Sequence, residues 1–409
     1  MALREALQVV LRFGSLMLRA GDTVFRVREA MGLLARSMGV ETLQVHIGLD
    51  SMVVTARRGG EQVTQASEIA PLGINAWRIT ALDRLARSSR AGLSPVQLAA
   101  DLDAIEAAPP LRSTFTVALG IGLASGAFSY LNGGDTQGTA AAILAGGLGQ
   151  ALRALLFQRQ WNQYAVTALC AVFTAGLYCL IIAAMGSAFS AAHAAGFIFS
   201  VLFLVPGFPL VASLLDLVQH QTVAAMARLA YALMVLLAAA IGLSAVAAIA
   251  GIAVEPAMAS PSGVEPLTLA LRALASFAGG CGFAVLYNSS TRTVLAVGVL
   301  SLLGNELRLA LHDLGMGLPP ATFIGALLVG LLASAVQAAW TESRIVLTVP
   351  SIIIMTPGLY AFQTIVLLNQ GEISPAIQAA ATCFFIVGGM ALGLVAARFL
   401  TERQWTIER

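Results

Sequence analysis

The chain has 409 residues, of which 58% are hydrophobic and only 11% are charged, and its mean hydropathy is +0.84. A soluble domain of average composition is about 45–50% apolar and about 25% charged, so these values exclude an ordinary soluble enzyme, a disordered chain and a coiled coil. The net charge of +2 provides no basic field for nucleic acid. We therefore expect an integral membrane protein with no nucleic-acid partner.

More than half of the charged residues lie in residues 1–112, which predicts a small α+β head domain in front of a membrane body. Arg12 and Arg19 interrupt the apolar N-terminal run, so we expect no signal peptide and a cytoplasmic head. Asp22 is expected to be the N-cap of the second helix. Spacing and turn residues predict helices over residues 3–18 and 24–38, strands within 43–49, 51–57 and 61–69, and helices over 74–88 and 95–107.

The head carries no convincing catalytic motif. Ser51 follows Asp50 and lies near His46, but no GxSxG motif surrounds it, and the chain has no Walker A or GxGxxG motif. A hairpin turn at Asp50 is the interpretation that we favour. The four cysteines have no CxxC or Cys/His spacing, so no disulfide or metal site is expected. The head is therefore expected to regulate or gate, and the protein is expected to be no enzyme and to need no cofactor.

The membrane body is expected to contain ten spans, because ten apolar segments of about 20 residues follow the head. Their expected bounds are 114–131, 138–157, 164–185, 191–215, 222–250, 264–286, 293–312, 319–339, 345–368 and 375–400. With the head inside, the inner loops and span ends would hold Arg112, Arg153, Arg159, Arg228, Arg292, Arg344, Arg398, Arg403 and Arg409. The outer halves would hold only Arg272 and Arg308, and the loop with Glu255 and Glu265 would lie outside. This positive-inside bias predicts that both termini are cytoplasmic.

The membrane body repeats itself. Residues 197–215 (FIFSVLFLVPGFPLVASLL) align with residues 348–366 (TVPSIIIMTPGLYAFQTIV), which places Pro206-Gly207 over Pro357-Gly358. The neighbouring spans align in the same order, so residues 113–250 and 264–409 are each expected to form a five-span repeat. An odd number of spans per repeat inserts the second repeat upside down. The expected fold is therefore an α-helical polytopic membrane protein with an inverted 5+5 repeat and an α+β cytoplasmic N-terminal domain.

A Pro-Gly pair lies in the middle of the fourth span and of the ninth span. Proline lacks an N–H and clashes with the preceding turn, so each pair is expected to break its helix. In a membrane the freed backbone groups need partners from the protein or from a watery cavity. A kink that serves only packing is the alternative, but recurrence at equivalent places in two halves is typical of a substrate site.

Three segments carry a resemblance to a known family: AGDTVFRVREAMGLLARSMGVE in the head, FLVPGFPLVASLLDL in the fourth span and VPSIIIMTPGLY in the ninth. In this order, and on this architecture, they resemble the ThrE-type threonine/serine exporters over nearly the whole chain. The resemblance implies export of threonine and serine across the bacterial inner membrane, driven by the proton motive force. It also implies an alternative substrate, since related systems with the two halves on separate chains are linked to succinate export.

Ionisable residues inside spans are costly and are candidates for function. Glu306, beside Asn305, is the first candidate for proton coupling, and a structural ion pair with Arg272 or Arg308 is the alternative. Arginines and helix N-termini suit the carboxylate of an amino-acid substrate, whereas a glutamate and free carbonyls suit its ammonium group. The substrate-binding candidates are Pro206, Gly207, Asn305, Glu306, Pro357, Gly358, Tyr360, Gln363, Arg272 and Arg308.

Two further charged residues lie nearer the inner surface. Asp216 is the second candidate for proton coupling, and the favoured alternative is that water solvates it or that it pairs with Arg228. Arg153 is expected to extend to the membrane surface. Stretches of small residues such as AAAILAGGLGQA are consistent with packing within the chain and with a homo-oligomer.

We therefore expect a proton-coupled exporter of threonine and serine, in which inverted halves alternate around a site lined by the fourth, seventh and ninth spans. One alternative is a dicarboxylate exporter, in which Arg153, Arg272 and Arg308 would bind two carboxylates. A membrane-anchored sensor, whose head signals and whose body is only an anchor, is the alternative of another class. A plain anchor has no need of ten spans with a repeated break.

Overall fold

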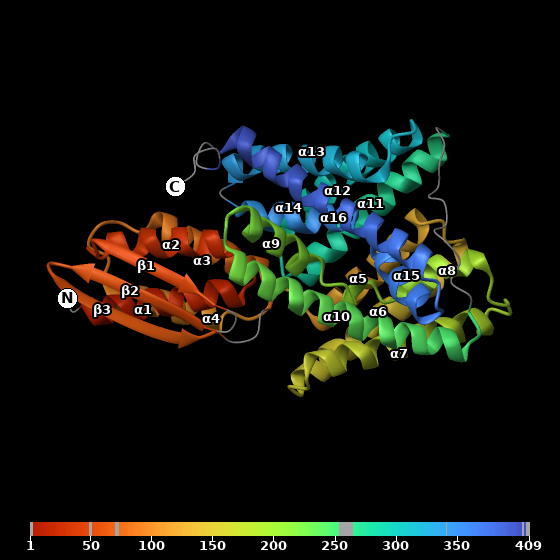
Figure 1. Cartoon of the computed structure of the whole chain (residues 1–409), viewed down its shortest axis with the longest axis horizontal. Helices are drawn as coiled ribbons and strands as arrows, with labels where there is room; N and C mark the ends of the chain where they lie inside the picture. The colour runs from red at the N-terminus through yellow and green to blue at the C-terminus, as the bar shows by residue number, and fades with distance from the viewer. Residues whose placement is uncertain are drawn as a thin grey trace.

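The computed structural model describes residues 3–48, 51–69, 73–252, 265–340, 342–402 and 405. The expected turn at Asp50, the outer-loop residue Glu255, and Arg403 and Arg409 lie outside these residues. Figure 1 shows a small part with a β-sheet, in red and orange, at one end of a larger helical body.

The N-terminal part combines one three-stranded antiparallel sheet, in the order β1-β2-β3, with four helices. Its elements are α1 (Leu3–Arg19), α2 (Val24–Ser37), β1 (Thr42–Ile47), β2 (Ser51–Arg58), β3 (Glu61–Glu68), α3 (Ala76–Ser88) and α4 (Pro95–Ala107). Successive side chains of a strand point to opposite faces. Met52, Val54 and Ala56 of β2 are therefore fully buried on the face that α1 covers.

The helix starts in this part differ slightly from the expected ones. The N-cap of α2 is Thr23, whose side chain makes no capping hydrogen bond, and the expectation for Asp22 was wrong. The Asp22 carboxylate instead forms an ion pair with Arg26 at 3.0 Å. Helix α3 begins at Ala76 because the side chain of Asn75 accepts a hydrogen bond from the N–H of Arg78.

Ten spans follow if each bent helix pair is counted as one, and they agree with the expected segments to within a few residues. The long helices are α5 (Thr114–Leu131), α6 (Thr136–Gln158), α7 (Gln163–Ala184), α10 (Thr222–Ile249), α11 (Pro266–Leu286), α12 (Thr291–Asp313), α13 (Leu318–Trp340) and α16 (Ile373–Thr401). The fourth span is α8 (Ala191–Ser200), η1 (Leu202–Leu204) and α9 (Gly207–Val218), bent by 64°. The ninth is α14 (Arg344–Ile353) and α15 (Gly358–Asn369), bent by 54°.

The two five-span halves have matching helix neighbours. Helix α5 packs on α6, α6 on α7 and α7 on α10, and in the second half α11 packs on α12, α12 on α13 and α13 on α16. The broken spans reach across: α9 contacts α14 and α16, while α15 contacts α8 and α10. In Figure 1, α15 accordingly lies beside the green helices of the first half. Such reciprocity is typical of halves related by a pseudo-two-fold axis; the inverted orientation stays a prediction.

Close contact between the halves depends on glycine. Helices α5 and α11 lie side by side, and a Cβ atom on Gly282 would be 2.4 Å from the carbonyl oxygen of Gly120. No larger residue fits at Gly282 without separating the two helices. Small residues allow this kind of approach in helices that pack within a membrane.

The N-terminal part contacts one end of the membrane body, at the end of α9, the end of α11 and the start of α14. Val24 donates its N–H to Asp216, Ala76 donates its N–H to the carbonyl of Tyr287, and Thr80 donates its hydroxyl to Glu342. Each membrane-side partner belongs to a loop or span end that the arginine distribution places on the inner side. The three contacts therefore lie at one end of the membrane body, and the cytoplasmic position of that end stays a prediction.

Candidate functional site

The two Pro-Gly breaks have the same backbone geometry. Pro206 precedes α9 with φ −81° and ψ 56°, and Pro357 precedes α15 with φ −80° and ψ 50°. In each break the N–H of the following glycine bonds to the carbonyl two residues earlier, at 2.9 Å for Gly207 and 2.8 Å for Gly358. Since proline cannot donate at this position, the helix stops and restarts in a new direction. The breaks predicted from the sequence are therefore present, and they are equivalent.

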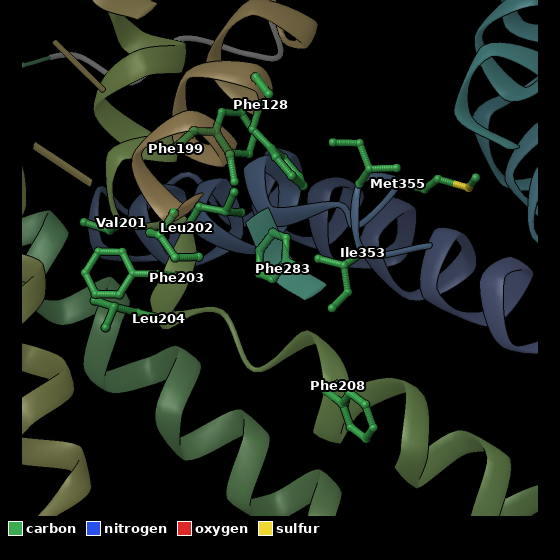
Figure 2. Packing of buried hydrophobic residues seen from close by; sticks show 14 of the residues in the cluster. Phe128, Phe199, Val201, Leu202, Phe203, Leu204, Phe208, Phe283, Ile353 and Met355 are labelled. Carbon is green, nitrogen blue, oxygen red and sulfur yellow. The ribbon is translucent and has the colours of Figure 1, made fainter. Parts of the chain in front are cut away.

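The two breaks meet at an apolar centre. A Cβ atom on Gly207 would lie 3.2 Å from Ile353, which ends α14, and one on Gly358 would lie 3.6 Å from Phe199 of α8. Figure 2 shows Phe283 of α11 between the side chains of the first broken span and Ile353. Buried aromatic and aliphatic side chains fill this centre.

A cavity of about 160 Å³ opens beside the first break, on the side of the N-terminal part. Its wall includes Arg153, Gln163, Pro206, Tyr231 and Tyr287. These side chains come from four different spans and from the Pro-Gly break. The cavity is thus a place where one cation, two phenols and an interrupted backbone converge.

Arg153 of α6 does not have the partner that a membrane arginine usually needs. Its guanidinium donates to the carbonyl oxygen of Phe203 at 3.4 Å and lies 5.1 Å from the ring centroid of Phe157. Its Nε is buried with no hydrogen-bond partner, and among the described residues it forms no ion pair with a carboxylate. The extension of Arg153 to the membrane surface stays a prediction. The sequence does contain a signal for this unpaired arginine, because Arg153 lies 18 residues from Asp135 and 63 from Asp216, the acidic residues of its half of the body.

A second polar cluster lies in α11 and α12. Arg272, which is 1% exposed, pairs with Asp313 at 2.7 Å and with Glu306 at 3.5 Å. Ser276 donates to Glu306 at 3.3 Å, and Asn305 donates its amide to Ser276 at 2.9 Å. The ion pair named as the alternative for Glu306 is thus present with Arg272. The topology expected from the arginine distribution would place this cluster in the outer half of the membrane.

Arg308 is the remaining charged candidate of the second half, and it lies near enough to Arg272 of this cluster for the two charges to interact. Arg308 lies near Tyr360 of α15, and its buried Nε has no hydrogen-bond partner. Gln363, on the next turn of α15, is buried. Arg308 and Tyr360 are therefore brought together from the seventh and ninth spans, although the sequence separates them by more than 50 residues.

Asp216 occupies a buried position under the N-terminal part. Its side chain is fully buried, pairs with Arg228 at 3.5 Å and accepts the Val24 N–H at 2.8 Å. The ion pair with Arg228 was anticipated, whereas the alternative that water solvates Asp216 at the interface was not correct. Arg228 also donates to the backbone carbonyl of Asp22, so this contact joins α2, α9 and α10.

No metal site was found, since no group of three potential ligands occurs among His, Cys, Asp and Glu of the described residues. The chemistry available is that of charge recognition. Cations are held near two span breaks, and a carboxylate at Glu306 is shared with Arg272 and Ser276. Such groups bind zwitterions and exchange protons.

Comparisons with known proteins cover nearly the whole chain. Residues 8–250 match the family described as "Putative threonine/serine exporter", ThrE, and residues 272–400 match the family described as "Threonine/Serine exporter, ThrE". No solved structure matches the chain significantly.

Two kinds of curated relative are similar to it. A Mycobacterium tuberculosis protein named "Probable threonine/serine exporter" is 26% identical over 95% of this chain and 76% of its own length. An Escherichia coli K12 protein named "Probable succinate transporter subunit YjjP" is 26% identical over 58% of this chain and 92% of its own length. Its Klebsiella aerogenes namesake is 27% identical over 55% of this chain and 86% of its own length. With its apolar helices, these likenesses indicate a multi-pass membrane transport protein.

Proposed function

The chain belongs to the ThrE family of threonine/serine exporters, and from this premise we propose that it exports threonine and serine by proton antiport. The observation that carries the proposal is the reciprocal pair of Pro-Gly breaks, each packed against the other half. Two equivalent broken spans at the interface of two repeats are the usual setting of a transporter site.

We propose the division into a cytoplasmic head (1–112) and two inverted five-span repeats (113–250 and 264–409). Support comes from the matching helix neighbours of the two halves and from the contacts of the N-terminal part with loops on a single side. The arginine distribution supports an inner-membrane protein with both termini in the cytoplasm.

The proposed mechanism is alternating access. We take the apolar contact between Gly207 and Ile353 as the closed point of the proposed path. Rocking one half against the other would separate the breaks and open the centre to one side at a time. The substrate would then contact Pro206, Gly207, Pro357 and Gly358 at the breaks. Tyr360, Gln363, Arg308, Arg272 and Asn305 complete the proposed binding region.

Glu306 is the proposed proton-coupling residue. Its carboxylate pairs with Arg272 at 3.5 Å, whereas the pair of Arg272 with Asp313 is shorter, at 2.7 Å. The pair with Glu306 is therefore the weaker of the two pairs that Arg272 makes. Protonation from outside would release Glu306 from Arg272 and leave the Asp313 pair intact. Deprotonation towards the cytoplasm would restore the pair and reset the transporter. Asp216 is the second proposed proton-coupling residue. A change in its protonation would act through its ion pair with Arg228.

The test is flux into or out of proteoliposomes that contain the purified chain, with labelled threonine and an imposed pH gradient. Uptake or release that follows the gradient, and collapses with a protonophore, is expected. Flux that ignores the gradient would remove proton coupling, and absence of threonine and serine flux would remove the substrate assignment.

Export of dicarboxylates is the second candidate, because two relatives carry the name of a succinate transporter subunit. Two guanidiniums, those of Arg272 and Arg308, lie near each other in the second half. In the same vesicles, competition by succinate but not by serine would favour this candidate. Competition by serine alone would exclude it.

A further inference from the structure

We propose that the cavity at the first break is a binding site for the carboxylate of a small α-amino acid, and that Arg153 is the residue that holds it. The proposal rests on the proposed exporter function for its physiological direction, but binding can be measured without transport. It adds an entry site on the cytoplasmic side to the binding region at the centre.

Charge is the first reason. Arg153 is part-buried, and a guanidinium held against apolar surfaces without an anionic partner is costly. Arg153 has only the Phe203 carbonyl at 3.4 Å and the Phe157 ring, and its buried Nε has no partner. A substrate carboxylate would accept two parallel hydrogen bonds from the guanidinium, which is the bidentate geometry that arginine favours.

The second reason is the set of groups around that cation. Arg153 is the only charged side chain among the residues that line the cavity in the described part of the chain. One guanidinium satisfies one carboxylate, so a dicarboxylate would leave its second charge without a partner in an apolar wall. The cavity therefore fits a monocarboxylate.

The third reason is the partner for an ammonium group. The Phe203 carbonyl lies in the short η1 helix just before Pro206, where the main chain leaves helical geometry. When a zwitterion enters, its carboxylate binds the guanidinium of Arg153. The guanidinium then no longer donates to the Phe203 carbonyl, which can accept a hydrogen bond from the ammonium group instead. Tyr231 and Tyr287 add hydroxyl groups to the same wall. The Phe203 carbonyl thus has a partner before and after binding, whereas the Nε of Arg153 gains one only when the carboxylate binds.

Size is the fourth reason. Pockets for drug-sized ligands have volumes of about 300–1,000 Å³, whereas this cavity has about 160 Å³. The cavity therefore has room for a ligand with few heavy atoms, such as serine or threonine.

The experiment measures equilibrium binding of labelled L-serine to the purified full-length chain, with unlabelled serine, serine methyl ester and succinate as competitors. Serine methyl ester keeps the ammonium and hydroxyl groups but has no carboxylate. The variants are Arg153→Gln and Arg153→Lys, with Arg159→Gln as the matched control, because Arg159 is an exposed arginine at the end of the same helix.

Arg153→Gln is expected to weaken serine binding about tenfold or more and to abolish the preference for serine over its methyl ester. Arg159→Gln is expected to bind as the unchanged protein does. Arg153→Lys keeps the charge but loses the fork, so it is expected to bind serine with intermediate affinity. If Arg153→Gln does not fold, Arg153→Lys provides the test. An Arg153→Lys protein with unchanged affinity for serine and an unchanged preference for serine over its methyl ester would overturn the proposal.

Failure of this inference and failure of the exporter function give different results. Gradient-driven serine flux with an unchanged KM in Arg153→Gln would overturn the Arg153 site and leave the exporter intact. Serine binding that depends on Arg153, without any gradient-driven flux, would support the site and overturn the exporter. Tighter binding of succinate than of serine, or no serine binding at all, would also overturn the proposal.

Discussion

Asp216 in α9 accepts a hydrogen bond of 2.8 Å from the backbone N–H of Val24, the first residue of α2. The first N–H groups of a helix have no partner within it, and Thr23 makes no capping bond. A membrane helix therefore supplies an acceptor to the start of a helix in the N-terminal part. This contact links α2 directly to α9, the second arm of a broken span.

Replacement of Asp216 is expected to destabilise the junction between α2 and the membrane body. Asp216→Ala leaves the buried Arg228 guanidinium without its carboxylate, and breaking such pairs costs about 3–5 kcal/mol. Thermal unfolding in detergent should show a lower Tm, and limited proteolysis should cut within residues 1–112 at lower protease concentration. Glu29→Ala, at an exposed position of α2, is the control. Equal Tm values for Asp216→Ala and Glu29→Ala would contradict this prediction.

The two prolines of the breaks are expected to have equivalent roles. Pro206→Ala and Pro357→Ala each restore an N–H and favour a continuous helix, so both should lower gradient-driven flux, by about tenfold or more if the break is the hinge. Pro319→Ala is the matched control, because Pro319 lies in the first turn of α13, where an N–H would have no helical partner anyway. Normal flux in either break variant would show that the bend serves packing alone.

Glu306→Gln separates coupling from binding. The neutral amide cannot release or take up a proton, so pH-driven net flux is expected to disappear. Exchange of labelled for unlabelled substrate at equal pH on both sides should continue, since exchange needs no net proton movement. Glu372→Gln, at an exposed glutamate before α16, serves as the control. A Glu306→Gln protein that still concentrates substrate in response to a pH gradient would assign proton coupling to another residue.

The pair of Arg12 and Glu106 predicts a pH dependence of stability in the N-terminal part. The hydrogen bond from Arg12 lowers the pKa of Glu106 from its usual range. A lowered carboxyl pKa stabilises the fold at pH values above the unfolded value of about 4.3, and this stability is lost as the pH falls through the folded value. Both side chains are more than one third exposed, so the gain is below about 1 kcal/mol. Glu106→Gln should therefore lower Tm slightly at pH 7, and this difference should shrink as the pH falls below about 4.3. A difference in Tm that stays constant with pH would refute the assignment.

Much of the fold could be predicted from local chemistry. The first span was expected at 114–131 and α5 is Thr114–Leu131, because a membrane span needs only length and apolarity. The breaks at Pro206 and Pro357 were also predictable, since the missing N–H of proline acts on its own turn. The capping of α2 was predicted incorrectly, because Asp22 is drawn into a pair with Arg26, which also contacts Asp83 of α3.

By itself, the sequence determined the ten apolar segments, the two breaks, the uneven distribution of charge and the small set of ionisable residues within the spans. Only the tertiary structure decided what those residues contact. Arg153 meets Phe203, and Asp216 meets Val24, across 50 and 192 residues of intervening chain. The physical reason is that apolarity and proline geometry act within one helix, whereas the partner of a buried charge depends on which distant helices pack around it.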